Sequence, residues 1–302
     1  MNERVAYLNG EIVPESKATI SIRDRGFLLG DAVFDTTRTF GHKIFRLEEH
    51  LDRLFRSLKY LRIDPGMTKD DLANLTMQVL EANLPLLGDD DDYWVTQRFT
   101  RGSGISQEDP STFKPTVIIE CLPLPLKERA RLYRDGLTIV TPSIRRTPPE
   151  AMSPRAKMNN YINLVLADLE VKGQNPDAMA ITLDINGNLC EGMGSNIVIV
   201  KDEAVLTPRE QYVLAGISRE VTMELAEQEG ITVYQKDIDL FDAYTADEVF
   251  VTSTSFCVCP VSTVNGTGIG TGQVPGPITH QLQQAYSDLV GIDIVQQYLR
   301  WL

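Results

Sequence analysis

Residues 153–161 read Ser-Pro-Arg-Ala-Lys-Met-Asn-Asn-Tyr, with Lys157 between a proline-containing turn and the expected start of a helix. Small or apolar residues lie close on both sides of Lys157, whereas most surface lysines have charged neighbours. Apolar surroundings disfavour the charged form of a lysine and make its amine nucleophilic, which is what formation of a Schiff base requires. On this segment alone, an ordinary lysine at a helix N-terminus is the simpler interpretation.

The composition is that of an ordinary globular protein, with 302 residues of which 42% are hydrophobic and 24% charged. This length is enough for two domains with separate cores. The net charge of −13 argues against nucleic acid and anionic membrane surfaces as partners, because no basic stripe is present to neutralise phosphates. Part of this charge is the run Asp89–Asp92, which we interpret as a solvated loop before a strand.

The cysteines and histidines predict neither a disulfide framework nor a metal site. They are scattered along the chain: Cys121, Cys190, Cys257, Cys259, His42, His50 and His280. Without a Cys-x-x-Cys pair, we expect buried free thiols in a reducing cytosol. The N-terminal segment MNERVAYLNGE lacks the apolar core of a signal peptide, and no apolar run reaches membrane-spanning length. These features predict a cytoplasmic protein.

The first part of the chain, residues 1–121, predicts a small α/β domain. Asn9–Gly10 is typical of a tight hairpin between two short strands. Leucines at helical spacing predict a helix over residues 47–61. On that helix, Arg53 shares a stripe with His50 and Ser57 beside the leucines, so we expect Arg53 to reach inward. A second helix over 68–82 begins with a capping-box pattern, and strands are expected at 33–40, 43–46, 93–100 and 116–121.

A linker is expected next, because the alternating prolines of Leu-Pro-Leu-Pro-Leu, residues 122–126, favour a stiff extended chain and cannot continue a sheet. We place the linker at 122–133 and a large domain, which carries Lys157, at 134–302. The elements expected in the large domain are strands at 137–141, 179–184, 196–200, 232–235 and 248–252, a hairpin at 265–272, and helices at 160–171, 217–229, 277–290 and 294–301. The predicted class is α/β (α+β).

Two segments of the large domain could bind a ligand together with Lys157. Glu191 lies in a glycine-rich turn that permits close backbone approach, and its carboxylate could pair with a protonated ring nitrogen. The alternative is an ordinary turn glutamate. A helix begins after Gly216, and the free N–H groups of Ile217 and Ser218 could bind phosphate. Ser218 is as readily an N-terminal capping residue.

Hydroxyl groups crowd the strand end Val-Thr-Ser-Thr-Ser, residues 251–255, where Thr254 and Ser255 could contact phosphate oxygens. Threonine-rich strands are common, so this composition is unremarkable by itself. Arg53 could add a charge-assisted contact, or it could form an ordinary surface ion pair. Taken together with Lys157 and Glu191, these features fit pyridoxal 5′-phosphate (PLP). That cofactor needs an imine lysine, a partner for its ring nitrogen and a phosphate site.

The same segments resemble the class IV (fold-type IV) PLP-dependent aminotransferases. The resemblance rests on Glu-His-Leu-Asp-Arg-Leu around Arg53, on Lys157, on Glu-Gly-Met-Gly-Ser-Asn from Glu191, and on the Leu-Ala-Gly-Ile-Ser-Arg and Val-Thr-Ser-Thr-Ser segments. It covers nearly the whole chain and keeps the motifs in order. The family includes branched-chain aminotransferases, D-amino acid transaminases, (R)-selective amine transaminases and aminodeoxychorismate lyases.

The resemblance implies two α/β domains with the cofactor between them, in a homodimer. It implies that Lys157 binds PLP as an imine and then shuttles a proton between the substrate Cα and the cofactor carbon. Glu191 would keep the pyridine nitrogen protonated. The residues implied to hold the phosphate are Arg53, Ile217, Ser218 and Thr254. Tyr161 resembles the tyrosine that contacts the ring hydroxyl in the branched-chain enzymes, although it is one residue closer to the lysine.

The expected substrate-binding residues match no single subgroup of the family. Branched-chain enzymes have a Tyr-Ile-Arg-Pro strand, in which Thr96 replaces the arginine here. Arg98 lies two residues further, on the same strand face, and could be a shifted carboxylate anchor. Phe34 occupies the place of the carboxylate-binding tyrosine of D-amino acid transaminases. The aromatic residues that could line an apolar pocket, or could be plain core, are Phe27, Phe34, Phe40 and Trp94.

We therefore predict a transaminase that transfers an amino group from an apolar, branched-chain-like amino acid to a 2-oxo acid. The ending Gln297–Leu302 favours this subgroup. The alternatives are a D-amino acid or (R)-selective amine transaminase, an aminodeoxychorismate-type lyase, and a non-catalytic protein that binds a phosphate ligand. Intact Lys157 and Glu191 argue against the non-catalytic alternative.

Overall fold

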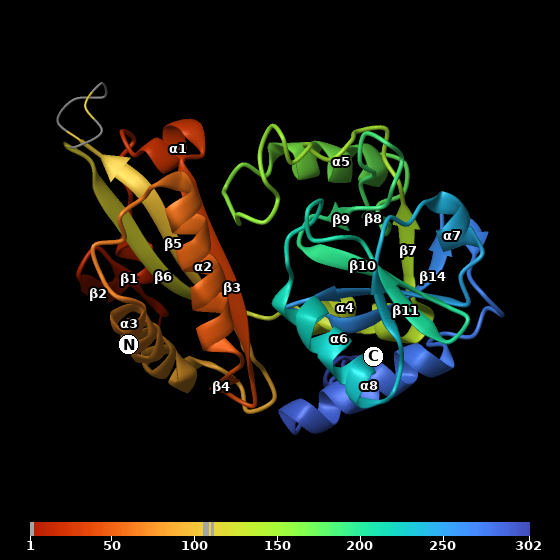
Figure 1. Ribbon diagram of the computed structural model, residues 1–302. Helices are drawn as coiled ribbons and strands as arrows, with labels where there is room; N and C mark the ends of the chain where they lie inside the picture. Colours follow the sequence, from red (N-terminus) through yellow and green to blue (C-terminus); the bar gives the residue numbers. More distant parts are fainter. Residues whose placement is uncertain (1–2, 105–108, 110–111) are drawn as a thin grey trace. The chain divides into compact units, whose positions relative to one another are not determined.

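The computed structural model describes residues 3–104, 109 and 112–302. The chain forms two units (Figure 1): Met1–Leu124 with Ala156–Asn160, and Pro125–Arg155 with Tyr161–Leu302. The segment that contains Lys157 therefore belongs to the first unit, whereas the sequence assigned it to the C-terminal domain. The backbone of this segment is hydrogen-bonded to Ser57, Phe34 and Ala32, which are at least 100 positions away in the sequence. Local sequence patterns cannot indicate such distant contacts.

The first unit is built on an antiparallel sheet with strand order β2-β1-β6-β5-β3-β4. Its strands are β1 (Val5–Leu8), β2 (Glu11–Pro14), β3 (Ala32–Phe40), β4 (Lys43–Ile44), β5 (Tyr93–Ser103) and β6 (Lys114–Pro123). In β3 and β5, Phe34 lies opposite Arg98 and Thr36 lies opposite Thr96. Because strand side chains alternate between faces, these four side chains share one face of the sheet. The predicted strands of this unit are confirmed.

Helices α2 and α3 pack against the other face of this sheet. The helical elements of the unit are α1 (Arg25–Leu29), α2 (Leu47–Leu61), α3 (Lys69–Asn83) and the short turns η1 (Glu15–Lys17) and η2 (Leu84–Leu86). The leucine stripe predicted for α2 is confirmed, with Leu51, Leu54 and Leu58 buried. The capping box predicted at the start of α3 is also present, formed by Thr68 and Asp71.

The second unit contains a mixed sheet with strand order β12-β11-β10-β13-β14-β7-β8, to which β9 and β15 are added. Its strands are β7 (Leu137–Val140), β8 (Met179–Ala180), β9 (Glu191–Gly192), β10 (Ser195–Lys201), β11 (Ala204–Thr207), β12 (Val233–Gln235), β13 (Glu248–Ser253), β14 (Cys257–Val264) and β15 (Thr267–Gly268). Its helices are α4 (Leu126–Asp135), α5 (Ile162–Lys172), α6 (Ile217–Gln228), α7 (Leu240–Tyr244), α8 (Pro277–Val290) and α9 (Gln296–Leu299). The hairpin expected at 265–272 is confirmed by the pairing of β14 with β15.

The division between the units falls after Leu124, within the residues expected as a linker, but the stiff extended connector expected over 122–126 is wrong. Strand β6 continues to Pro123, which pairs with Tyr93, and α4 begins at Leu126. A proline is tolerated there because β1 pairs with β6 only around Ile118 and Ile119. The end of β6 therefore has a strand neighbour on one side only, where a missing N–H can be accommodated.

The interpretation of Asp89–Asp92 as a wholly solvated run is wrong at its last residue. Asp92 is buried and accepts hydrogen bonds from the backbone N–H groups of Gly41 and His42, at 3.3 and 3.1 Å. It also accepts one from the Thr39 hydroxyl. Because the β3–β4 turn leaves these N–H groups without a strand partner, an acceptor at the start of β5 satisfies them.

The expectation of buried free thiols is confirmed, since all four cysteines are free and buried. Burial raises the pKa of the Cys121 thiol to about 12, and it raises the pKa of Cys190 and Cys259 still further. In the part of the chain that the structure describes, no helix combines the length and the apolar character needed to cross a bilayer.

Candidate active site

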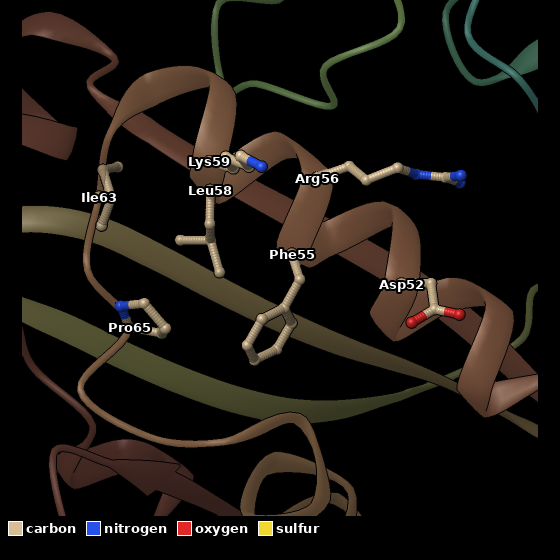
Figure 2. A pocket seen from close by; sticks show the side chains of 7 residues that line it. All are labelled: Asp52, Phe55, Arg56, Leu58, Lys59, Ile63 and Pro65. Atoms are coloured by element: carbon tan, nitrogen blue, oxygen red, sulfur yellow. The ribbon is translucent and has the colours of Figure 1, made fainter.

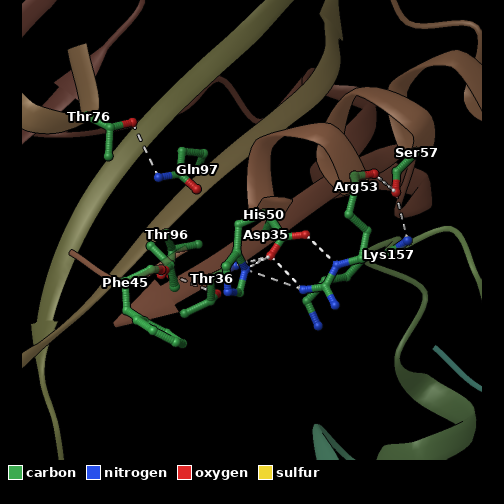
Figure 3. A network of polar contacts seen from close by, with 11 residues as sticks. Asp35, Thr36, Phe45, His50, Arg53, Ser57, Thr76, Thr96, Gln97 and Lys157 are labelled. Atoms are coloured by element: carbon green, nitrogen blue, oxygen red, sulfur yellow. Dashed lines mark hydrogen bonds and ion pairs between the residues drawn. The ribbon is translucent and has the colours of Figure 1, made fainter. Parts of the chain in front are cut away.

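The backbone of Lys157 is hydrogen-bonded to two elements of the first unit. Its N–H donates to the Ser57 hydroxyl of α2 at 3.0 Å (Figure 3), and its carbonyl accepts from the N–H of Phe34 in β3 at 3.0 Å. The N–H of Asn159 donates to the Ala32 carbonyl at 2.9 Å, so this segment runs beside the start of β3. Helix α2 and strand β3 therefore fix where the lysine side chain begins.

The side chain of Lys157 lies over an aromatic ring on the face of the sheet opposite α2. Its Nζ is 4.7 Å from the centroid of the Phe34 ring, and the guanidinium carbon of Arg98 is 4.8 Å from the same centroid. Both distances allow a cation–π interaction. The structure thus brings together three of the residues that the sequence selected: Lys157, Phe34 and Arg98.

Arg53 is anchored by Asp35, a buried acid in β3 (Figure 3). Its Nε and Nη2 donate to the two carboxylate oxygens of Asp35 at 2.8 and 2.7 Å. Burial alone would raise the pKa of Asp35, but the charge and hydrogen bond of Arg53, together with the hydrogen bond of His50, outweigh burial and hold that pKa well below its ordinary value. Arg53 is 3% exposed, so its predicted inward orientation is confirmed and the surface ion pair is excluded.

His50 completes this cluster from the same helix. Its Nδ1 lies 2.7 Å from Asp35 Oδ1. Burial lowers the pKa of His50 more than the neighbouring carboxylate raises it, so the imidazole is neutral near pH 7. A neutral imidazole facing a carboxylate must carry its proton on the facing nitrogen. His50 therefore donates a hydrogen bond to Asp35, and Arg53 is the cation that forms an ion pair with that carboxylate.

The face of the sheet that carries Phe34 also carries polar groups. Arg98 donates to the side-chain oxygen of Asn159 at 2.9 Å, and its Nη2 lies 3.9 Å from a carboxylate oxygen of Glu120. The hydroxyls of Thr36 and Thr96 are 2.9 Å apart. This face can therefore receive a polar or charged group of a substrate as well as an apolar one.

The aromatic residues suggested for an apolar pocket are dispersed. Trp94 is half-buried on β5, two residues from Thr96 and so on the same face. Phe40 belongs to the core, with its ring 5.4 Å from that of Phe45. Phe27 is 66% exposed on α1. Phe34 and Trp94 lie on the strand face that carries Arg98, and by the same alternation Phe40 lies on that face at the far end of β3.

In the second unit, Glu191 is a buried carboxylate with a partner at each oxygen. Arg146 Nε donates to Oε1 at 2.8 Å, and the backbone N–H of Leu214 donates to Oε2 at 2.8 Å. Both partners fix the orientation of the carboxylate. Each carboxylate oxygen has a second lone pair for a ligand N–H, so Glu191 can still accept from a protonated ring nitrogen.

The turn before α6 is held by the Asn196 side chain. Its amide donates to the Leu214 carbonyl at 3.0 Å, and its Oδ1 would lie only 2.1 Å from a Cβ placed on Gly216. Gly216 is the N-cap of α6 and no side chain caps the helix, so Ser218 is not the capping residue. The first N–H groups of a helix have no partner within it, which leaves those near Ile217 and Ser218 for an anion.

The hydroxyl-rich segment 251–255, at the end of β13, includes both half-buried and fully buried side chains. Thr254 is half-buried. The Ser255 hydroxyl accepts a hydrogen bond from Arg129, and its carbonyl accepts one from the Tyr298 hydroxyl, so Ser255 contributes to the packing of this unit. The hydroxyl of Thr252, opposite Asn196 in the strand register, is buried and lacks a hydrogen-bond partner in the described residues.

Tyr161, proposed from the resemblance to contact the cofactor ring, precedes α5 in the second unit. It occupies the N-cap position of α5 and is half-buried. The sequence-selected residues thus form two groups. The first unit holds Arg53, Lys157, Phe34, Trp94 and Arg98, and the second holds Tyr161, Glu191, Gly216, Ile217, Ser218, Thr254 and Ser255.

These residues fit the chemistry of PLP. That cofactor needs a lysine amine, an acid for its ring nitrogen and an anion site. The structure supplies a Lys157 fixed by its backbone, a Glu191 carboxylate held by Arg146, and a helix start where a glycine is required by the contact with Asn196. The buried hydroxyl of Thr252, which has no hydrogen-bond partner among the described residues, is a further polar group in the second unit.

Two cavities have linings that do not include Lys157. One, of about 560 Å³, follows the side of α2 and is lined by Asp52, Phe55, Arg56, Leu58, Lys59, Ile63 and Pro65 (Figure 2). A smaller one, of about 50 Å³, includes Arg146, Cys190 and Tyr212 in its lining. Within residues 3–104, 109 and 112–302, no group of three or more acidic, histidine or cysteine side chains could hold a metal ion.

Comparison with known proteins identifies the family. The model of the amino-transferase class IV family matches residues 32–264. The chain belongs to this family. The class IV enzyme is 38% identical, over 94% of its length, to a putative branched-chain-amino-acid aminotransferase of Methanocaldococcus jannaschii, of which it covers 95%. It is 33% identical to the branched-chain-amino-acid aminotransferase of Pseudomonas aeruginosa, over 95% of this chain and 92% of that one.

Solved structures agree with this class IV assignment. The crystal structure of Escherichia coli branched-chain amino acid aminotransferase matches with a TM-score of 0.87 and 28% identity, covering 95% of each chain. That of Thermobaculum terrenum, in its PLP form, matches with a TM-score of 0.84 and 26% identity, covering 99% and 97% of the two chains. The fold and the family predicted from the sequence are confirmed, and the protein is a PLP-dependent aminotransferase.

Sequence patterns did not single out several residues that shape the site. Asp35 was missed, although an acid inside a strand expected to be buried is itself a signal of a charged partner. Asn196 was quoted within a motif but given no role, and Arg146 was not singled out, because their partners are distant in sequence. Ser57 was placed on the Arg53 stripe, and its contact with Lys157 spans 100 positions.

Proposed function

We propose that this aminotransferase transfers the amino group of an apolar, branched-chain-like amino acid to a 2-oxo acid, with Lys157 as its catalytic lysine. The observation that carries the proposal is 38% identity over 94% of the chain to a putative branched-chain-amino-acid aminotransferase. Bound PLP supplies the aldehyde carbon that receives the amino group and a ring that withdraws electrons. The side chains and backbone of the enzyme bind the cofactor, orient it and transfer the proton.

In this proposal Lys157 binds the cofactor and its Nζ then moves the proton of the substrate Cα. Glu191, held in place by Arg146 and the Leu214 N–H, accepts from the ring nitrogen and favours its protonated form. The phosphate is bound by Arg53, Gly216, Ile217, Ser218 and Thr254, with Ser255 beside them. Tyr161 contacts the ring hydroxyl.

We propose Arg98 as the anchor for a substrate carboxylate, with Phe34 and Trp94 as the apolar contacts of the donor. Arg98 is 28% exposed, and its ion pair with Glu120 is long, at 3.9 Å. An incoming carboxylate can therefore form a shorter and stronger charge-assisted contact than the one that Glu120 provides. This would explain how the enzyme manages with Thr96 in place of the family arginine.

We also propose that the enzyme acts as a homodimer in the cytoplasm. Exposed apolar side chains gather at α1 and just before it, where Ile22, Phe27, Leu28 and Leu29 are 75%, 66%, 50% and 58% exposed. A cluster of this kind is typical of a protein–protein contact. The free buried thiols agree with a reducing compartment. A Phe27→Asp variant that remained dimeric by light scattering would count against a contact at α1.

The substrate proposal is tested by single-turnover spectra of the PLP enzyme with a panel of donors. We expect L-leucine, L-isoleucine and L-valine to convert the visible absorbance of the bound cofactor to that of its amine form. D-alanine and both enantiomers of 1-phenylethylamine should not. Fast conversion by D-alanine or by the (R)-amine, with no response to L-leucine, would replace the branched-chain proposal with the corresponding alternative. Pyruvate release from added aminodeoxychorismate, with retained absorbance, would indicate a lyase.

A further inference from the structure

We infer that Ser57 is a positioning residue for Lys157, because its hydroxyl fixes the peptide N–H of the lysine on the helix that carries Arg53. The inference rests on the proposed role of Lys157 as the residue that binds the cofactor. It concerns a hydroxyl that needs no contact with cofactor or substrate and acts through the lysine backbone.

The hydrogen-bonding capacity of the Ser57 hydroxyl is used in two directions (Figure 3). It donates to the Arg53 carbonyl one helical turn earlier, at 2.9 Å, and it accepts from the Lys157 N–H at 3.0 Å. Ser57 is 1% exposed, so water cannot replace either bond. A buried N–H without an acceptor is unfavourable, and the chain therefore keeps Lys157 against α2.

The same two elements fix both Lys157 and Arg53. In β3, Phe34 donates its N–H to the Lys157 carbonyl and the next residue, Asp35, holds the Arg53 guanidinium. In α2, Arg53 and Ser57 are one turn apart, and Ser57 holds the Lys157 N–H. Adjacent residues on one strand and one helix turn thus set the spacing between an amine and a guanidinium.

This spacing matters for a cofactor that is attached at one end and held by charge at the other. If Lys157 binds the aldehyde carbon and Arg53 the phosphate, their separation must match the length of the cofactor, and a loose lysine backbone weakens both contacts together. Loss of the Ser57 hydroxyl should therefore affect retention of the cofactor and the titration of the lysine-bound chromophore, in addition to stability.

The chain offers a matched control in α8. The Ser287 hydroxyl donates to the Gln283 carbonyl at 2.8 Å and accepts from the Ile294 N–H at 3.1 Å, and Ser287 is also buried. Ser287→Ala therefore removes two hydrogen bonds of the same kinds as those lost in Ser57→Ala. It does so in a helix that has no proposed cofactor residue. The two variants should lose similar stability in the absence of cofactor.

The test uses holoenzyme of the wild type, Ser57→Ala, Ser287→Ala and Ser57→Thr. We measure the rate at which visible absorbance is lost on transfer to PLP-free phosphate buffer, and the pH midpoint of that absorbance. We expect cofactor loss about tenfold faster in Ser57→Ala, as one lost hydrogen bond predicts, with a shifted midpoint. Ser287→Ala should match the wild type, and Ser57→Thr, which keeps a hydroxyl, should recover most of the difference.

Two results would count against the account in different ways. A wild type that is yellow, with Ser57→Ala and Ser287→Ala equal in cofactor loss and in midpoint, would overturn the role of Ser57 and leave the proposed function intact. A wild type that takes up no PLP, or whose absorbance survives Lys157→Ala, would overturn the proposed function itself. If Ser57→Ala does not fold, Ser57→Cys, whose thiol is a weaker donor and acceptor, takes its place. Faster cofactor loss than from the wild type, with a shifted midpoint, supports the inference, and a rate and midpoint equal to the wild type overturn it.

Discussion

Replacement of Asp35 by asparagine should destabilise the first unit far more than replacement of an exposed aspartate on the same helix–sheet layer. Asp35 and Arg53 are 0% and 3% exposed, and removing one partner of a buried ion pair costs about 3–5 kcal/mol because the other charge remains buried. Asp52 is the matched control, since it pairs with Lys69 at 2.8 Å but its side chain is 51% exposed. The control Asp52→Asn should cost at most about 1 kcal/mol.

Urea unfolding of the cofactor-free protein measures the difference in unfolding free energy between the two variants, and tryptophan fluorescence can restrict the measurement to the first unit of the chain. The chain has two tryptophans, Trp94 in the first unit and Trp301 in the second, so in a Trp301→Phe background the fluorescence reports on Trp94 alone. We expect the midpoint of Asp35→Asn to fall strongly and that of Asp52→Asn to stay near the parent. Equal midpoints for the two variants would refute the assignment of Asp35 and Arg53 as a pair that depends on both charges.

The pH dependence of the same measurement follows from the sign of the Asp35 shift. Its pKa in the folded protein lies below the ordinary value of 3.8, so the unfolded chain takes up the proton first as the pH falls. The stabilisation by ionised Asp35 is therefore complete well above pH 3.8 and declines below it. The difference between the parent and Asp35→Asn should be constant from pH 6 to pH 8, and a difference that shrinks in this range would contradict the argument.

Three further predictions concern other parts of the molecule. Because burial raises the pKa of Cys121 to about 12 and raises those of Cys190 and Cys259 further, native protein at pH 8 should not react with Ellman's reagent, and all four thiols should react in urea. Glu248 accepts the N–H groups of Ile278 and Thr279 at the start of α8, at 2.8 and 2.7 Å, so Glu248→Ala should cost about 0.5–2 kcal/mol and lower Tm by a few degrees; an unchanged Tm would rule out this capping role. Arg98→Ala should raise KM for 2-oxo acids at least tenfold while the visible spectrum stays that of the parent, and an unchanged KM would remove Arg98 as the anchor.

Local pattern was sufficient for most elements of the fold. The leucine spacing of α2 and the capping box of α3 report short-range physics, the burial of one helix stripe and the satisfaction of the first N–H groups. The same applies to α8, which the sequence placed at its observed bounds. Predictions from local pattern were wrong where a contact with a residue distant in the sequence determines the structure. Pro123 remains in β6 because one side of the strand is open there, and Asp92 is buried because a turn needs its carboxylate.

For the site, the sequence supplied the individual groups but could not supply their partners. Lys157, Glu191 and Arg53 were selected by residue type and by motif. Their surroundings depend on residues distant in the chain: Ser57 for Lys157, Arg146 for Glu191, and Asp35 for Arg53. These contacts join residues 100, 45 and 18 positions apart, and no local pattern reports such a pairing, so the orienting residues required the structure.

The most direct measurement is borohydride reduction of the PLP-loaded enzyme, followed by tryptic digestion and mass spectrometry. A phosphopyridoxyl group on Lys157 blocks cleavage at that residue. The account therefore predicts a single labelled peptide that begins at Ala156, after Arg155, and ends at Lys172, with unlabelled protein cleaved at Lys157. Labelling of a different lysine, or absence of label from protein that has bound PLP, would contradict the assignment of Lys157 as the catalytic residue.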